Sequence, residues 1–157
     1  MDKRLLSNAL KHIGGTFTHK GWVLLYGIEF SGRLMRRVLV HDLSKMMPDE
    51  MDGFVRVIDH LRATEYMSER YKELLAEIGP SLQNHYRRNS HHPEHHRRGL
   101  EGMDLLDVVE MFLDWRASCK RYKDGDILSS VRRNQKRFRL GTKLSEILAN
   151  EARRRMV

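Results

Sequence analysis

The pentapeptide His41–Lys45, with the sequence His-Asp-Leu-Ser-Lys, carries the residue types best suited to metal chemistry. An imidazole and a carboxylate stand side by side, and a carboxylate can bridge two metal ions through its two oxygens. Five of the nine His residues lie between positions 85 and 96. Further on, Asp107, Glu110 and Asp114 recur at helical spacing. Together these groups indicate a site for one or two divalent ions, from Mn, Fe, Co, Ni, Zn or Mg.

Other catalytic motifs do not occur in the sequence. It has no zinc-finger ligand spacing, no G-x-S-x-G nucleophile elbow and no glycine-rich phosphate loop. One structural alternative stays open for the acidic residues, because Arg116 and Lys120 could pair with them in a salt-bridge network.

Helices are the elements that must position these groups, because apolar residues recur at helical spacing and strand-like alternation is short. We expect breaks or bends at Gly14-Gly15 and Ser31-Gly32, and helix caps at Asp49 and Ser81. The expected helices span 3–13, 16–30, 33–45, 50–62, 64–78, 82–89, 104–119, 127–140 and 144–156. The helix over 104–119 is apolar around most of its circumference, so it should be central and buried.

The excess positive charge lies at the end of the chain. Of 29 Lys and Arg residues, 12 lie in 118–157 with 4 of the 21 Asp and Glu residues, which leaves 17 of each sign in 1–117. The sequence thus predicts a single all-α domain over 1–157, a compact bundle of about six to eight helices. Within it, 1–117 forms the metal-site core and 118–157 a basic extension of two helices packed on that core. The extension could bind nucleic acid or an acidic partner, or be a solvated face.

Cysteine content and hydropathy bear on the compartment. The single Cys119 excludes an internal disulfide and fits a reducing compartment. No apolar run approaches ~20 residues, and the first residues lack a signal-peptide core. We therefore expect a cytoplasmic protein with no membrane association.

The order of the motifs resembles the HD-domain superfamily of metal-dependent phosphohydrolases. That order is one His, an adjacent His-Asp pair, further His residues and a late helical Asp. The fuller pattern is similar to a family of HD-like proteins of unknown function, DUF5662, found mostly in bacteria and phages. The matching pieces are His12, His19-Lys20, His41–Lys45, Glu50, His85, Arg88-Asn89, His91-His92, Glu110-Met111 and Asp114, with Ser130, Asn134 and Arg137-Phe138 near the end.

The resemblance implies a role for each matched residue. A first metal ion would be held by His19, His41, Asp42 and Asp114, and a second by Asp42, His85 and either His91 or His92. Asp42 and Lys45 would be catalytic: a water activated by the metal attacks phosphorus, and Lys45 offsets the developing charge. Substrate phosphate would contact Lys45, Arg88, Asn89, Arg133 and Arg137, while His12 and Glu110 would orient the metal ligands.

These roles imply an HD-type hydrolase that acts on a small phosphorylated substrate, a nucleotide or a related phosphomonoester. Ser44 stands where cyclic-dinucleotide phosphodiesterases of the superfamily often have Gly, and their Gly-Tyr-Pro signature is missing, which argues against such substrates. His95-His96 stand where the family often has aromatic residues, and they could be spare ligands or solvent-exposed. HD-type domains often dimerise, so a homodimer is compatible with the resemblance.

Two other functions fit the same residues. The ligand set also serves HD-type di-iron oxygenases, which cleave C–C or C–P bonds. Alternatively, the metal is structural and the protein is a non-catalytic module that binds nucleic acid or a partner through its basic extension.

Overall fold

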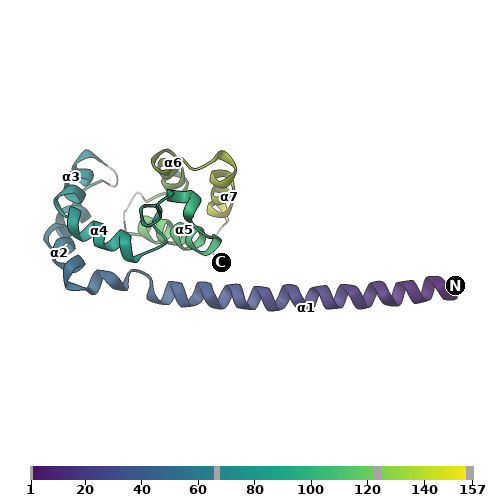
Figure 1. Cartoon of the computed structure of the whole chain (residues 1–157). Helices are drawn as coiled ribbons and strands as arrows, with labels where there is room; N and C mark the ends of the chain where they lie inside the picture. Colours follow the sequence, from purple (N-terminus) through teal and green to yellow (C-terminus); the bar gives the residue numbers. More distant parts are fainter. Residues whose placement is uncertain (1, 66–67, 122–124, 155–157) are drawn as a thin grey trace. The chain divides into compact units, whose positions relative to one another are not determined.

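The computed structural model describes every residue except 1, 66–67, 122–124 and 155–157, and its described part is helical with no strand. The seven α-helices are α1 (Lys3–Val40), α2 (Pro48–Ala63), α3 (Glu69–Glu77), α4 (Gly79–Arg88), α5 (Leu105–Cys119), α6 (Ile127–Phe138) and α7 (Thr142–Arg153) (Figure 1). Three short 3-10 helices complete the described chain: η1 (Leu43–Met46), η2 (Pro93–His95) and η3 (Gly99–Gly102). The predicted all-α class is confirmed.

Contacts divide the chain into two units, Met1–Leu39 and Val40–Val157, which are described separately. This division does not coincide with the predicted boundary between 117 and 118. Among the described residues, no helix combines the length and the apolar character that a membrane crossing requires.

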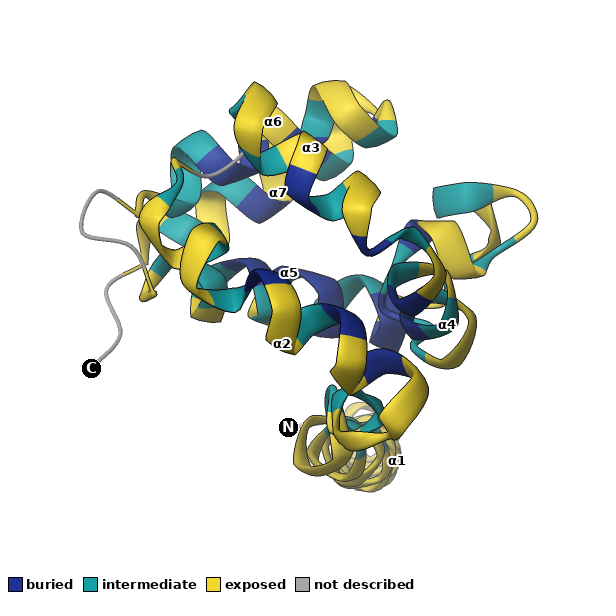
Figure 2. Cartoon of the chain, turned by 90° about the vertical axis from the view of Figure 1, so that its left-hand side faces the viewer, coloured by how far each residue is buried: buried dark blue, intermediate teal, exposed yellow. Residues whose placement is uncertain are grey.

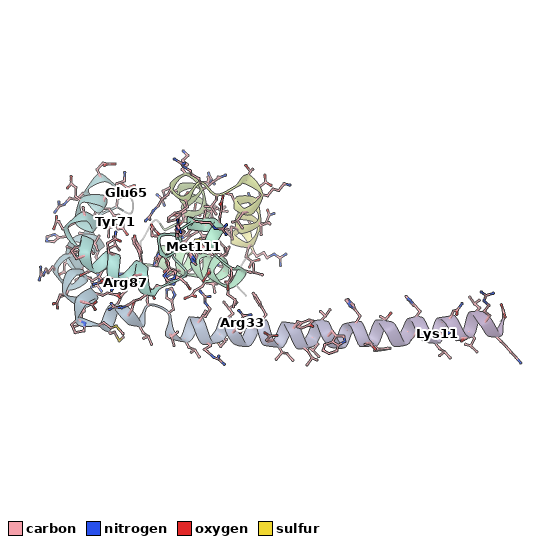
Figure 3. The ribbon with its side chains drawn as sticks, in the orientation of Figure 1. Lys11, Arg33, Glu65, Tyr71, Arg87 and Met111 are labelled. Atoms are coloured by element: carbon pink, nitrogen blue, oxygen red, sulfur yellow. The ribbon has the colours of Figure 1, made fainter. Side chains whose placement is uncertain are left out.

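Helix α1 is continuous, so the breaks predicted at Gly14-Gly15 and Ser31-Gly32 are wrong. A glycine inside a helix costs about 1 kcal/mol relative to alanine, which neighbouring helix formers can outweigh. Side chains project all along the helix, Lys11 and Arg33 among them (Figure 3). No residue of α1 is buried, and its exposed apolar residues include Leu5, Leu10, Ile13, Trp22, Leu25 and Ile28.

The helix expected over 33–45 ends early because of the backbone at Asp42. Helix α1 ends at Val40, and Asp42 has φ 59° and ψ 8°, the left-handed conformation. Aspartate tolerates this conformation better than most residues, and it turns the chain out of a helix. The turn leads into η1, which places Lys45 one short turn after Asp42.

Helices α2, α3 and α4 pack together around Val57, Leu74 and Ile78. Helix α2 starts at Pro48, a favoured first helical residue, so Asp49 lies in its first turn instead of capping it. Helix α4 likewise starts at Gly79 and includes Ser81, the predicted cap. Gly53 faces Ser81 so closely that a Cβ at position 53 would collide with the serine side chain.

Helices α5, α6 and α7 form the second core, around Met111, Phe112, Trp115, Val131, Leu140 and Leu148. Figure 2 shows buried residues along α5, and Met111 lies within this group in Figure 3. A capping box between Asp104 and Asp107 starts α5 close to the predicted residue. Leu105 and Leu113 are exposed, so α5 is less completely buried than predicted.

Two C-terminal helices are present, as predicted, with shorter bounds. Helix α6 ends at Phe138 because Arg139 adopts the left-handed conformation, with φ 54°. Helix α7 starts at Thr142, two residues before its prediction, and positions 155–156 of the predicted helix lie outside the described residues.

Candidate metal centre

The second unit brings together imidazoles and carboxylates from four segments. The turn after α1 supplies His41 and Asp42, α4 supplies His85, the segment after α4 supplies His91 and His92, and α5 supplies Asp114. Their candidate ligand atoms form two groups, each with all atoms within 4.8 Å of one another. The first group is Asp42, His85, His91 and His92, and the second is His41, His91 and Asp114.

The two carboxylate oxygens of Asp42 face different imidazoles. Its Oδ1 lies 3.4 Å from Nε2 of His85 and 3.6 Å from Nε2 of His91. Its Oδ2 lies 3.5 Å from Nε2 of His41, which is also 3.5 Å from Oδ1 of Asp114. These separations are long for hydrogen bonds. They match ligands of a shared ion, since donor atoms about 2.0–2.2 Å from a metal lie roughly 3.0–3.5 Å apart.

Two buried ligand atoms lack a hydrogen-bond partner. They are Oδ1 of Asp42 and Nε2 of His91, which lie 3.6 Å apart. A buried polar atom without a partner costs about 1–3 kcal/mol, so native proteins rarely keep one without a reason. A divalent cation between these atoms would satisfy both, and the nitrogen and oxygen donors suit such an ion.

Buried carboxylates behind the imidazoles fix their orientation. Oε1 of Glu110 lies 2.9 Å from Nδ1 of His41 and 3.3 Å from Nδ1 of His91. Oε2 of Glu50 lies 3.0 Å from Nδ1 of His85. Because Nδ1 of each ring faces a carboxylate, a proton on Nδ1 would bond to that carboxylate and leave Nε2 as a lone-pair donor toward the centre. Glu110 therefore has the position its predicted orienting role requires.

Glu50 is itself held by Arg88, for which the sequence predicted substrate binding, and by Ser44, to which the sequence assigned no role. Oε1 of Glu50 accepts a hydrogen bond of 2.8 Å from Arg88, and Oε2 accepts one of 2.9 Å from Ser44. The Arg88 guanidinium also donates to both carboxylate oxygens of Asp49. Asn89 donates to Ser44 Oγ at 2.7 Å. The family resemblance picked out Glu50 without a role, and only the fold shows that it contacts His85.

A second support orders the segment that carries His91. Ser90 donates to Oδ1 of Asp107 at 2.7 Å, and Nε2 of His96 lies 2.8 Å from the carbonyl oxygen of Ser90. Asp107 and Glu110 thus contact the histidine segment, while Arg116 lies 3.9 Å from Glu151. These partners differ from the salt-bridge network considered for the acidic stripe.

Electrostatics set most of the ligands in their metal-binding protonation states. Burial lowers the pKa of His92 to about 2, assisted by the charges of His91 and His85. Burial also lowers the pKa of His85, and Lys45 adds to the effect. Burial is the largest single influence and would raise the pKa of Asp42, but the charge and hydrogen bond of Lys45, together with the charges of His41 and His85, lower the pKa below its usual value.

His41 behaves differently. Its bonds with Asp114 and Glu110 raise its pKa to about 10, so the metal-free protein holds a proton there at neutral pH. Metal ligands must be deprotonated, so an ion that binds at His41 has to displace this proton.

A cleft of about 910 Å³ opens beside the ligands and lies within the second unit. Its lining includes His41, Asp42, His85, His92 and Asp114 at the metal centre, with Lys45 and Arg137. Lys45 forms an ion pair with Oδ2 of Asp42. Arg137 donates to Glu94 at 2.7 Å and to the Tyr86 hydroxyl at 3.4 Å.

The remaining predicted residues are divided between the two units. Arg88, Asn89 and Arg133 are described residues that do not line the cleft. His12 and His19 belong to α1 in the first unit, so their predicted roles stay predictions. His95 is exposed, with Nδ1 3.0 Å from the carbonyl oxygen of Tyr86.

The second unit is therefore an all-helical scaffold around a buried histidine–carboxylate centre that opens into a cleft. The chain matches the Family of unknown function (DUF5662) over residues 8–156 and belongs to it. No curated protein matches the chain, and no solved structure matches it.

Proposed function

We propose that the protein is an HD-type, metal-dependent phosphohydrolase that acts on a nucleotide or a related phosphomonoester. The observation that carries the proposal is Asp42, whose two oxygens face separate imidazole groups and whose buried Oδ1 has no hydrogen-bond partner among the described residues. The motif order that resembles the HD superfamily supports the reaction class, and Lys45 at the cleft supports an anionic substrate.

The proposed ligands form two sets that share Asp42. One set is His41, Asp42 and Asp114, with His19 as a further predicted ligand, and the other is Asp42, His85, His91 and His92. A bound divalent ion supplies Lewis acidity toward a phosphoryl oxygen and lowers the pKa of a coordinated water. Hydrolysis then adds one water across the P–O ester bond and yields an alcohol and inorganic phosphate.

The chain's own residues would prepare this step. Glu110 and Glu50 hold Nδ1 protons, so the imidazoles present Nε2 lone pairs. Lys45 is paired with Asp42 in the metal-free protein. With a cation held by Asp42, the Lys45 ammonium would be free to contact a phosphoryl oxygen and offset its developing negative charge.

The test combines elemental analysis of the purified protein with phosphate release from a panel of nucleotides and simple phosphomonoesters, in Mn²⁺, Co²⁺, Ni²⁺ or Mg²⁺. We expect bound metal and phosphate release, both lost in Asp42→Ala with the helical circular dichroism kept. Asp52→Ala is the matched control, because Asp52 is an exposed carboxylate of α2. Absence of both metal and phosphate release would defeat the proposal. Tightly bound iron with oxygen-dependent turnover would favour the di-iron oxygenase instead.

A further inference from the structure

The cleft beside the metal centre has one wall that the proposed chemistry does not explain. Six apolar side chains line it, and we name them the apolar wall: Met51, Phe54, Val55, Ile58, Leu61 and Leu75. Five of the six come from α2, at the three- and four-residue intervals that place side chains on one helix face. From Phe54 to Leu61 this face extends about 10 Å at 1.5 Å per residue.

Two side chains of the apolar wall are exposed to solvent, and the other four are partly buried. Met51 is 42% exposed and Val55 is 62% exposed. Contiguous exposed apolar surface often marks a binding site. The cleft volume of about 910 Å³ lies within the usual range for small-molecule sites, about 300–1,000 Å³.

The apolar wall begins where the charged end of the cleft stops. Nζ of Lys45 lies 5.5 Å from the centre of the Phe54 ring, so the same region borders the metal centre and the apolar wall. Across the lining, Trp115 and Phe138 add aromatic surface, with stacked rings whose centres are 6.3 Å apart. A ligand anchored at the metal centre would therefore extend over apolar surface.

The chemistry of the apolar wall distinguishes among phosphomonoesters. None of its six side chains carries an N–H or O–H group to pair with the edge of a nucleobase, although the rest of the cleft lining includes Arg62, Tyr71, Ser118 and Arg121. We propose that the cleft binds phosphomonoesters of apolar alcohols, with the phosphate at the metal centre and the hydrocarbon group along the apolar wall. This inference rests on the proposed function for the position of the phosphate.

The first measurement compares kcat/KM for methyl, ethyl, butyl and hexyl phosphate with the full-length protein in Mn²⁺. These esters share one leaving-group chemistry and differ in apolar surface. We expect kcat/KM to rise by up to about fourfold per methylene, which corresponds to about 0.8 kcal/mol for each buried methylene. Equal kcat/KM for all four esters would overturn the inference, and a preference for AMP over hexyl phosphate in the same protein would strengthen that conclusion.

The second measurement needs no turnover. Calorimetry gives the affinity of the Mn²⁺-loaded protein for methyl-, butyl- and hexylphosphonate, whose C–P bonds resist hydrolysis. We expect affinity to increase with chain length, and a flat series would again overturn the inference. Length-dependent binding without hydrolysis of any phosphate ester would instead refute the proposed function and leave the apolar site standing.

The variants locate the effect on α2. Ile58→Asn should weaken hexylphosphonate binding at least tenfold and leave methylphosphonate binding unchanged. Ile147→Asn is the matched control, because Ile147 of α7 is 63% exposed and does not line the cleft. Val55→Asn, at an exposed position of the apolar wall, repeats the test if Ile58→Asn lowers the helical signal. Equal effects of the wall variants and the control on both ligands would contradict the assignment.

Discussion

Replacement of Asp42 by glycine should strengthen the metal-free fold and abolish metal binding. Asp42 has φ 59°, which costs an ordinary L-residue roughly 1–2 kcal/mol, aspartate less than that and glycine almost nothing. Its Oδ1 is also buried without a partner, a penalty of about 1–3 kcal/mol. The substitution removes both costs. It also removes the ion pairs with Lys45 and with the protonated His41, whose side chains are 37% and 24% exposed, and each loss should be about 0–1 kcal/mol.

The net expectation is a metal-free protein stabilised by about 1–3 kcal/mol in Asp42→Gly. Urea unfolding in EDTA, followed by circular dichroism, measures this change. The same titration in excess Mn²⁺ should raise the stability of the wild type by RT ln(1 + [L]/Kd) and leave the variant unchanged. Asp42→Asn isolates the contribution of the charge from that of the backbone, because asparagine tolerates the left-handed conformation but lacks the charge.

A contrary result would be informative. If the free energy of unfolding in EDTA is more than about 1 kcal/mol lower for Asp42→Gly than for the wild type, Asp42 is chiefly a structural partner of Lys45. The interpretation of its unpartnered oxygen as a metal ligand would then fail. A variant that binds Mn²⁺ as tightly as the wild type would refute it as well.

Three further outcomes follow from contacts in the second unit. Glu110→Gln should weaken metal binding by about 10- to 100-fold, measured by competition with a chelating dye, because Glu110 orients two imidazoles; unchanged affinity would remove that role. Gly53→Ala should lower the free energy of unfolding in urea by about 1–3 kcal/mol, because the added Cβ collides with Ser81. Gly79→Ala, which has open space around it, should leave that free energy nearly unchanged. Equal effects of the two substitutions would contradict the packing argument. His92 must fold neutral, because its folded pKa of about 2 lies below the unfolded value of about 6.5. Its contribution is complete above pH 6.5 and is lost as pH falls, by about 1.4 kcal/mol per pH unit. Unfolding in EDTA at pH 6.5 and 5.0 should show this slope, and His92→Gln should reduce it; an identical slope in the variant would contradict the assignment.

The helices of the second unit could be predicted well where a local signal marked them. Asp104 and Asp107 form the capping box that starts α5, and Pro48 and Gly79-Pro80 begin α2 and α4 within two or three residues of the prediction. The extent of α1 could not be predicted, because a glycine only weakens a helix and the neighbouring residues decide whether the helix continues. The left-handed backbone at Asp42 has no sequence signature beyond the residue type.

The candidate metal residues illustrate a different limit. The sequence singled out His41, Asp42 and Asp114 by residue type, and the fold places both carboxylates 3.5 Å from Nε2 of His41. Arg88 has the charge expected of a phosphate-binding residue, yet it contacts Asp49 and Glu50. Which carboxylate meets which cation depends on how α2 packs on α4, and that long-range packing is not encoded in local spacing.

The ligand sets also have a consequence for the way the chain is held together. His41 and Glu110 are 69 residues apart, and the centre joins the turn at His41-Asp42 to α4, the segment after α4 and α5. An ion at this point would act as a cross-link that closes long loops, and such links restrict the unfolded chain most. Metal supply would then govern how long the protein survives proteolysis as well as whether it turns over substrate, because both depend on the same few side chains.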